Sequence, residues 1–236
     1  MDLNIKKVKK NPVIIAAFPG FGLVGVIATE FLIEHLDTEI IGKHWFESQP
    51  ATTAVHEGKL IYPLSVHYNK KHNIIIVHSI GSGKRLDWEA SNIVLEVAKK
   101  TRASEIIMLE GVGSMSSEVS DKRNVFYHVQ DLKKAKALDK IKITVLREGI
   151  IMGATSAVML KSDKAIALFV ESSNGLPDSK GAARLVEVLD AYLNLKVDYA
   201  PLNEMAKKLE GKLKAILEQS KAVKKQEDEK LMSYVG

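Results

Sequence analysis

Residues 11–35 read NPVIIAAFPGFGLVGVIATEFLIEH, and this stretch decides the fold. Residues 13–18 form an uncharged apolar run, which is typical of a strand buried on both faces of a parallel sheet. A glycine-rich turn, residues 19–25, follows this run. Apolar residues then recur at helical spacing, namely Val26, Ile27, Leu32, Ile33 and Leu36. The stretch therefore predicts a strand, a tight turn and a helix.

The turn carries the spacing G-x-G-x-x-G at Gly20, Gly22 and Gly25, which is found in dinucleotide-binding proteins. Such sites need an acidic side chain at the end of the second strand to hold the ribose. The second expected strand, residues 39–45, ends in Gly-Lys-His-Trp without a carboxylate, and no phosphate-binding lysine follows the glycines. The residues favour a role for the glycines in backbone geometry and helix packing, and we predict no cofactor.

Composition limits the protein classes that remain. The chain has 236 residues, of which 46% are hydrophobic, enough for one α/β domain with an appendage. The formal charge of +5 comes from basic residues scattered along the chain, and aromatic residues make up only 6%, so we expect no nucleic-acid partner. The chain has no cysteine, which excludes disulfides and thiolate chemistry.

The first residues, MDLNIKKVKKNP, are charged and lack the apolar centre of a signal peptide. No apolar run approaches the ~20 residues of a membrane span. We therefore expect a cytoplasmic protein without a membrane partner.

Further along the chain, strands and helices alternate. Apolar runs at residues 74–77, 106–109 and 165–170 each lead into a segment that contains glycine, and helical patterns lie between the runs. Residues 51–58 read as a loop, and residues 59–68 read as an edge or hairpin strand because Pro63 cannot donate to a ladder. The alternation predicts an α/β fold, a three-layer α/β/α sandwich with a mostly parallel sheet, and it gathers the strand-end turns on one rim.

The C-terminal part differs from this core. Residues 179–195 predict a regular amphipathic helix, and Pro201 suits the first position of a last, heavily charged helix. We expect a core domain at residues 1–200, a charged amphipathic helix at 201–230 and a flexible tail at 231–236. A narrow apolar stripe on the last helix would pack on the core or on another subunit, and it includes Met205, Leu209, Leu213 and Ile216. The tail, with Leu231, Met232, Tyr234 and Val235, is either a frayed terminus or a peptide that enters a partner's pocket.

Three motifs in this order resemble the proteasome assembly chaperone family of the second-subunit type, which has many archaeal members. They are Pro19-Gly20-x-Gly22-x-Val24-Gly25, then Gly149-Ile150-Ile151-x-Gly153, then Pro177-Asp178-x-x-Gly181-Ala182-Ala183-x-Leu185 with Leu195-x-Val197-Asp198 behind it. The similarity spans roughly residues 11–211.

The resemblance implies a homo-oligomeric α/β/α domain, related to nucleoside-phosphorylase-like folds, without enzymatic chemistry. It implies proteasome α-subunits or α-rings as partners. Several family members enter pockets between α-subunits with a C-terminal hydrophobic-tyrosine-any tripeptide, for which Tyr234 is the candidate here. In this chain Tyr234 stands third from the end, after the polar Ser233, whereas the motif has a penultimate tyrosine after an apolar residue.

Two alternatives remain open. One is a homo-oligomeric scaffold with other protein partners. The other is a nucleoside- or nucleotide-binding or hydrolytic enzyme that uses the strand-end rim, where His78, Ser79, Glu110 and Glu171 could converge. None of the seven histidines has the spacing of a metal-binding helix, so we predict no metal site. The residues favour a binding or assembly protein over an enzyme.

Overall fold

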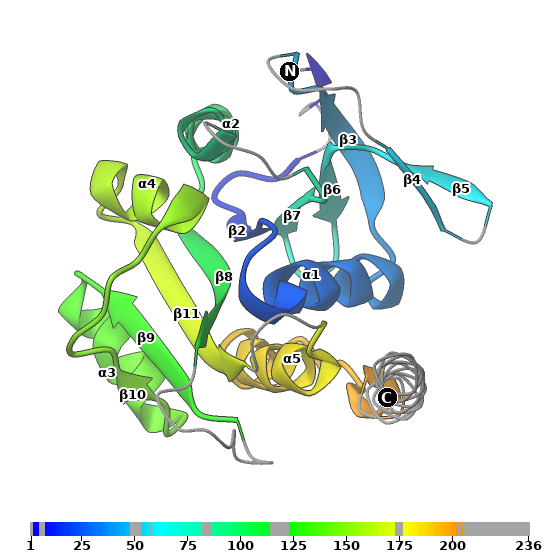
Figure 1. Ribbon diagram of the computed structural model, residues 1–236. Helices are drawn as coiled ribbons and strands as arrows, with labels where there is room; N and C mark the ends of the chain where they lie inside the picture. The colour runs from blue at the N-terminus through cyan, green and yellow to red at the C-terminus, as the bar shows by residue number, and fades with distance from the viewer. Residues whose placement is uncertain are drawn as a thin grey trace, which may run out of the picture.

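The computed structural model describes residues 2–4, 8–47, 53–56, 58–81, 86–113, 123–172, 177–202 and 204. Within these residues a nine-stranded sheet lies between two layers of helices (Figure 1). Its strands, in the order of the sheet, are β1 (Asp2–Leu3), β3 (Glu39–His44), β6 (Leu64–Asn69), β7 (Ile74–Ser79), β2 (Val13–Ala17), β8 (Glu105–Gly113), β11 (Ala165–Ser172), β9 (Val125–Val129) and β10 (Thr144–Val145). The helices are η1 (Phe21–Leu23), α1 (Val24–His35), α2 (Leu86–Thr101), α3 (Leu132–Lys140), α4 (Gly153–Lys161) and α5 (Ser179–Leu193).

The predicted α/β/α fold is confirmed. The four central strands, β7, β2, β8 and β11, run parallel, and antiparallel strands extend the sheet on both sides. Ile14 and Ile15 of β2 point to opposite faces, and both are fully buried. This double burial explains why the run at residues 13–17 has no polar alternation.

The helices divide between the two faces. The faces of α1 and α5 pack together on one side of the sheet, where Leu32 and Leu185 are fully buried. On the other side α2 packs against α4, with Val94 and Val158 in the second core cluster. The shorter α3 belongs to the first side, where Leu138 is fully buried. These two apolar clusters are the cores above and below the sheet.

The predicted helix at residues 179–195 is confirmed, with its end at Leu193. Asn194 ends it in the left-handed conformation, at a φ of 53°. The chain is helical again at residues 200–202 and 204, in agreement with the predicted helix start near Pro201. The remainder of that predicted helix lies outside the described residues.

Residues 54–68 differ from the prediction. Residues 54–56 form strand β4 (Ala54–His56) instead of a loop, and it pairs with β5 (Lys59–Ile61) in a separate two-stranded sheet that projects beyond β3 (Figure 1). Pro63 divides the expected single strand into β5 and β6. Of the two expected alternatives, the hairpin is confirmed for β6, which pairs antiparallel with β7, with Leu64 opposite Ser79 and Asn69 opposite Ile74. The edge position is wrong, because β3 pairs with the other side of β6. The proline lies just before β6, so the ladder loses no donor.

Gly25 holds α1 against the sheet. A Cβ at this position would lie 2.4 Å from the backbone oxygen of Leu109 in β8 and 3.0 Å from Cβ of Ala17 in β2. Contacts this short with backbone cannot be relieved by a side-chain rotation. The helix therefore approaches the sheet more closely than any other residue at position 25 would allow.

We predict that Gly25→Ala destabilises the protein by about 2 kcal/mol. Helix propensity alone favours alanine by about 1 kcal/mol, whereas overpacking against fixed atoms costs about 3 kcal/mol. The free energy of unfolding is measured by urea denaturation. The matched control is Gly149→Ala, whose Cβ would have side-chain atoms of Leu146 as its nearest neighbours, at 3.6 Å or more, and which should change stability by less than about 0.5 kcal/mol. Equal stability of the two variants would contradict the packing role of Gly25.

Candidate functional site

The motif turn at residues 19–25 lies at the edge of the sheet where the parallel strands end. Gly22 has a φ of 61°, in the left-handed region that favours glycine. A Cβ there would lie 2.0 Å from Oγ of Ser172 at the end of β11. Two separate constraints therefore require glycine at position 22, namely the left-handed backbone conformation and the close approach of β11.

Asp178 connects this turn to the start of α5. Its Oδ1 accepts a hydrogen bond of 2.8 Å from the backbone of Gly181, and its Oδ2 accepts one of 3.0 Å from Oγ of Ser172. Nε of Arg123 lies 3.3 Å from the same Oδ2, and both side chains are buried. The backbone N–H of Asp178 donates to the carbonyl of Gly22 at 2.8 Å. The first and third motifs of the sequence therefore form one hydrogen-bonded unit.

Glu110 in β8 connects the first motif to the second. A Cβ at Gly20 would lie 1.9 Å from Oε1 of Glu110, so the carboxyl group occupies the space that a side chain at position 20 would fill. Thr155, two residues after Gly153 at the start of α4, donates a hydrogen bond of 3.0 Å to Oε2. Burial raises the pKa of Glu110 from 4.5 to about 7, although the hydrogen bonds from Thr155 and from the Gly111 backbone act in the opposite direction.

Beside Glu110 lies a cavity of about 750 Å³. It extends along the strand ends on the side of α2 and α4, and the loop from β10 to α4 forms one wall. Its lining is mainly apolar and includes Phe18, Pro19, Gly20, Leu86, Ala90, Phe126, Leu146, Ile151 and Phe169. The sequence predicted that the strand ends gather on one rim. The structure shows that this rim borders a cavity of the size that small ligands occupy.

The cavity coincides with a change of direction in the fold. Strands β2 and β7 are parallel neighbours, but the helix after β2 packs on one face and the helix after β7 on the other. Pro19 follows β2 and Gly81 follows β7, and both line the cavity. In open α/β sheets, ligands bind in the crevice that such a divergence opens.

The four rim residues of the enzyme hypothesis do not come together. His78 lies on the face of α1, where its Nδ1 is 2.9 Å from Oγ1 of Thr29 and its Nε2 is 2.9 Å from Oε2 of Glu30. Glu110 lies on the opposite face, next to Thr155 of α4.

The other two rim residues have partners of their own. Ser79 donates to the carbonyl of Pro63 at 2.8 Å. Glu171 lines the cavity and accepts a hydrogen bond of 2.8 Å from Asn124. No serine–histidine–carboxylate set is therefore formed among these four residues.

Several residues of the site were missing from the predictions. Arg123, Thr155 and Ser172 carry the contacts of the two junctions, yet none lies in a recognisable pattern. Thr155 lies two residues after the second motif, and this proximity is the only feature of the sequence that could have indicated its role. The contacts of Arg123 and Ser172 depend on the tertiary fold.

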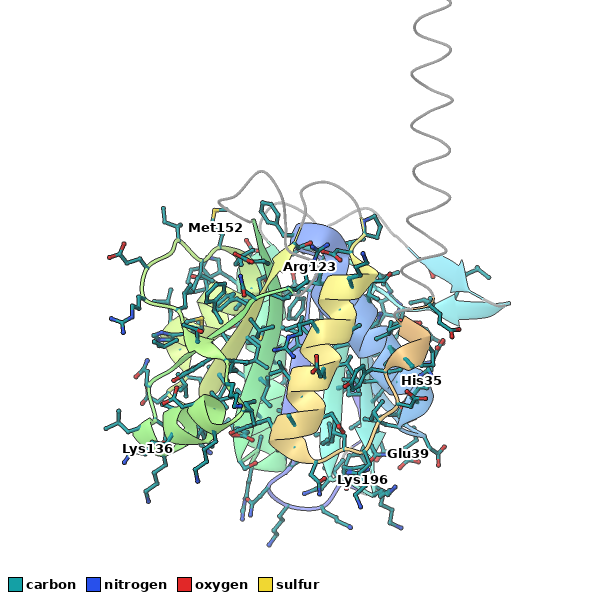
Figure 2. The ribbon with its side chains drawn as sticks, turned by 90° about the horizontal axis from the view of Figure 1, so that it is seen from below. His35, Glu39, Arg123, Lys136, Met152 and Lys196 are labelled. Atoms are coloured by element: carbon teal, nitrogen blue, oxygen red, sulfur yellow. The ribbon has the colours of Figure 1, made fainter. Side chains whose placement is uncertain are left out.

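The second motif also exposes apolar side chains. Ile150 is 92% exposed and Met152 is 73% exposed, in the loop that forms the cavity wall. Figure 2 shows Met152 and Arg123 at one end of the domain and Lys136, Glu39 and Lys196 toward the other. Exposed apolar side chains that lie close together often mark a surface for a partner.

The other predicted site residues are not placed. Residues 205–236, which include the stripe residues Met205, Leu209, Leu213 and Ile216 and the tail residues Leu231, Met232, Tyr234 and Val235, lie outside the described part of the chain. In the described ranges no group of three or more His, Asp or Glu side chains is arranged to hold a metal ion. Likewise, none of the described helices has the length and apolar character needed to cross a membrane.

We predict that Glu110→Gln stabilises the protein at alkaline pH. The carboxyl group titrates at about 7 in the folded protein and at 4.5 when unperturbed. Between these values the folded state binds more protons than the unfolded state, so stability falls as pH rises through this window. Glutamine removes that loss, and the gain in the free energy of unfolding should reach up to ~3 kcal/mol at pH ~8 and vanish near pH ~4.

Urea denaturation of both proteins across this pH range measures the difference. Glu148→Gln, at the exposed part of the same cavity wall, is the matched control and should give no such slope. A difference between E110Q and wild type that is independent of pH would contradict the assignment to the buried carboxyl group.

Comparison with known proteins gives the chain its relatives. The model described as "PAC2 family" matches residues 14–217. The protein MJ0106 of Methanocaldococcus jannaschii, itself uncharacterised, is 28% identical over 218 residues, covering 89% of this chain and 87% of that protein.

Among solved structures, PbaA of Pyrococcus furiosus, described as an archaeal homolog of proteasome-assembly chaperone, is 28% identical with a TM-score of 0.78 and 94% of each chain covered. PbaB of the same organism, described as an archaeal proteasome activator, shares the fold with 20% identity and a TM-score of 0.76, covering 91% of this chain and 96% of that one. The resemblance to proteasome assembly chaperones is confirmed. Since the family model covers the chain from residue 14 to residue 217, the protein belongs to the PAC2 family.

Proposed function

We propose that this protein forms a homo-oligomer and binds proteasome α-subunits or α-rings in the cytoplasm, as an assembly chaperone without catalytic activity. The observation that carries the proposal is the similarity to PbaA over 94% of both chains at 28% identity. All three sequence motifs lie within the matched part of the chain.

The geometry of the strand-end rim supports binding over catalysis. His78 and Glu110 are held on opposite faces of the sheet by separate partners. The first motif uses its glycines for close packing against β8 and β11. The second motif exposes Ile150 and Met152, and apolar side chains in such positions gain free energy when a partner covers them.

We propose that three successive parts of the chain have different roles. Residues 1–200 form the core, residues 201–230 a charged amphipathic helix and residues 231–236 a tail that docks on the partner. An oligomer presents several tails at once to a multimeric partner. Weak single contacts then add up through the high effective concentration of the remaining tails.

Deletion of residues 231–236 is expected to abolish binding of α-subunits while the oligomer stays intact. The deleted residues include Leu231, Met232, Tyr234 and Val235, the apolar and aromatic groups able to fill a pocket. Native mass spectrometry of the protein mixed with α-subunits or α-rings from its own source measures the complex.

Ser233→Ala is the matched control for this deletion, since it changes a polar tail residue and should leave binding unchanged. Retained binding after the deletion would refute docking through the tail. A wild-type protein that ignores α-subunits altogether would direct the search to other protein partners.

The double variant Leu209→Asp/Leu213→Asp is expected to lower the mass of the oligomer. Both leucines belong to the narrow stripe of the predicted last helix, and a carboxylate buried in an apolar contact is strongly unfavourable. Light scattering measures the mass, and circular dichroism checks that the core is folded. Lys207→Asp/Lys214→Asp, on the charged part of the same helix, is the control. If the mass of the leucine variant is unchanged, the stripe packs on the core domain of its own subunit and not on another subunit.

A further inference from the structure

Most of the phenylalanines of the chain line the strand-end cavity. The chain contains six, and five of them contribute to the lining, namely Phe18, Phe21, Phe46, Phe126 and Phe169. They come from four separate segments of the sequence, because only Phe18 and Phe21 are close neighbours in the chain, so no local pattern indicated that they gather. Aromatic ring faces attract cations, and an enclosure of several rings is a common binding site for ammonium groups.

Carboxyl groups also predominate among the charged side chains of this lining. Among the described residues, Asp87, Glu110, Glu148 and Glu171 line the cavity together with one guanidinium, that of Arg147. Oδ1 of Asp87 lies 3.8 Å from the position of a Cβ at Gly153, at the start of α4, and its charge contributes to the raised pKa of Glu110. The described lining is therefore apolar and aromatic with a net negative charge.

The size of the cavity selects the kind of cation. A volume of about 750 Å³ falls within the range of roughly 300 to 1,000 Å³ that small-molecule sites occupy. A metal ion would leave nearly all of this apolar space unfilled. We propose that the cavity binds a small organic ammonium ion, with its charged nitrogen beside Glu110 and an apolar or aromatic body among the phenylalanines.

The position of Glu110 determines where the charged end of the ligand would bind. Thr155 holds Oε2 and the backbone of Gly20 borders Oε1, so the carboxyl group is fixed in the cavity wall. A carboxylate in an apolar wall lacks the solvation that water provides, and a bound ammonium ion supplies a compensating charge. The apolar body of the ligand gains by leaving water. The ligand site is separate from the proposed docking of the tail, because all its residues belong to the core domain.

The test uses a matched pair of probes, 2-phenylethylamine and 2-phenylethanol, on the full-length protein. They share one skeleton, and only the amine is charged at neutral pH. Isothermal titration calorimetry should show saturable, millimolar or tighter binding of the amine, and at least roughly tenfold weaker binding of the alcohol. Binding of neither probe, or equal binding of both, would overturn the proposal.

Variants then locate the bound amine. Glu110→Gln should weaken binding of 2-phenylethylamine roughly tenfold or more and leave 2-phenylethanol unaffected. Phe126→Leu keeps an apolar side chain but removes a ring, and should weaken the amine several-fold. Glu34→Gln, which removes a charge from the exposed part of α1, should change neither affinity. Melting temperatures without ligand verify that each variant is folded. An amine affinity that E110Q leaves unchanged would overturn the site.

A lysine side chain of a protein partner offers the same ammonium chemistry. Nα-acetyllysine methylamide reproduces that side chain without a partner protein. We expect it to bind more weakly than 2-phenylethylamine, because it places less apolar surface among the rings. Tighter binding of the lysine derivative would overturn the assignment to a free small molecule. None of these measurements involves α-subunits, so the outcome is independent of the assembly function.

Discussion

The architecture depends on a close approach of backbone and side-chain atoms around the turn between β2 and α1. Gly20 leaves space for the carboxyl group of Glu110, Gly22 for Ser172, and Gly25 for the carbonyl of Leu109. Three different partners are thus in contact with one turn of seven residues. The turn fixes how α1, β8 and β11 lie relative to one another, and through Asp178 it also fixes the start of α5. Close-packed protein interiors transmit small displacements over several elements.

A buried carboxyl group next to this turn has two opposite effects. Folding must desolvate Glu110, which lowers the stability of the protein at high pH. The same desolvation strengthens any electrostatic interaction that the group makes with a bound molecule. Loss of stability at a functional position is a common property of binding sites. The hydroxyl of Thr155 could donate its hydrogen bond equally well to an uncharged acceptor.

The sequence alone allowed the fold to be predicted where the pattern is local. The strand at residues 13–17, the helix after it and the packing role of the glycines follow from the run of β-branched residues and from the missing ribose-binding carboxylate. The prediction from sequence was wrong where a glycine is required by a contact with a distant part of the chain. The apolar run at residues 106–109 was expected to lead into a segment that contains glycine at the strand end, but β8 continues through Gly113. Gly111 lies inside this strand, where a Cβ would be 2.2 Å from the backbone oxygen of Phe21. Glu110 was identified as a rim residue. Its neighbours Gly20 and Thr155 come from other parts of the chain, and the gathering of phenylalanines has no sequence period at all. The last helix and the tail remain predictions.

The β4–β5 hairpin differs from the rest of the domain in how it is held together. It is a two-stranded sheet of three residues per strand, and a hairpin of this size is only marginally stable by itself in water. Val55 and Leu60 are 69% and 55% exposed, so these two side chains bury little apolar surface. Its opening is therefore uncoupled from global unfolding, and its amide hydrogens should exchange with solvent long before those of β2. Because the described core does not depend on it, this arm can change in length and sequence at little cost to folding.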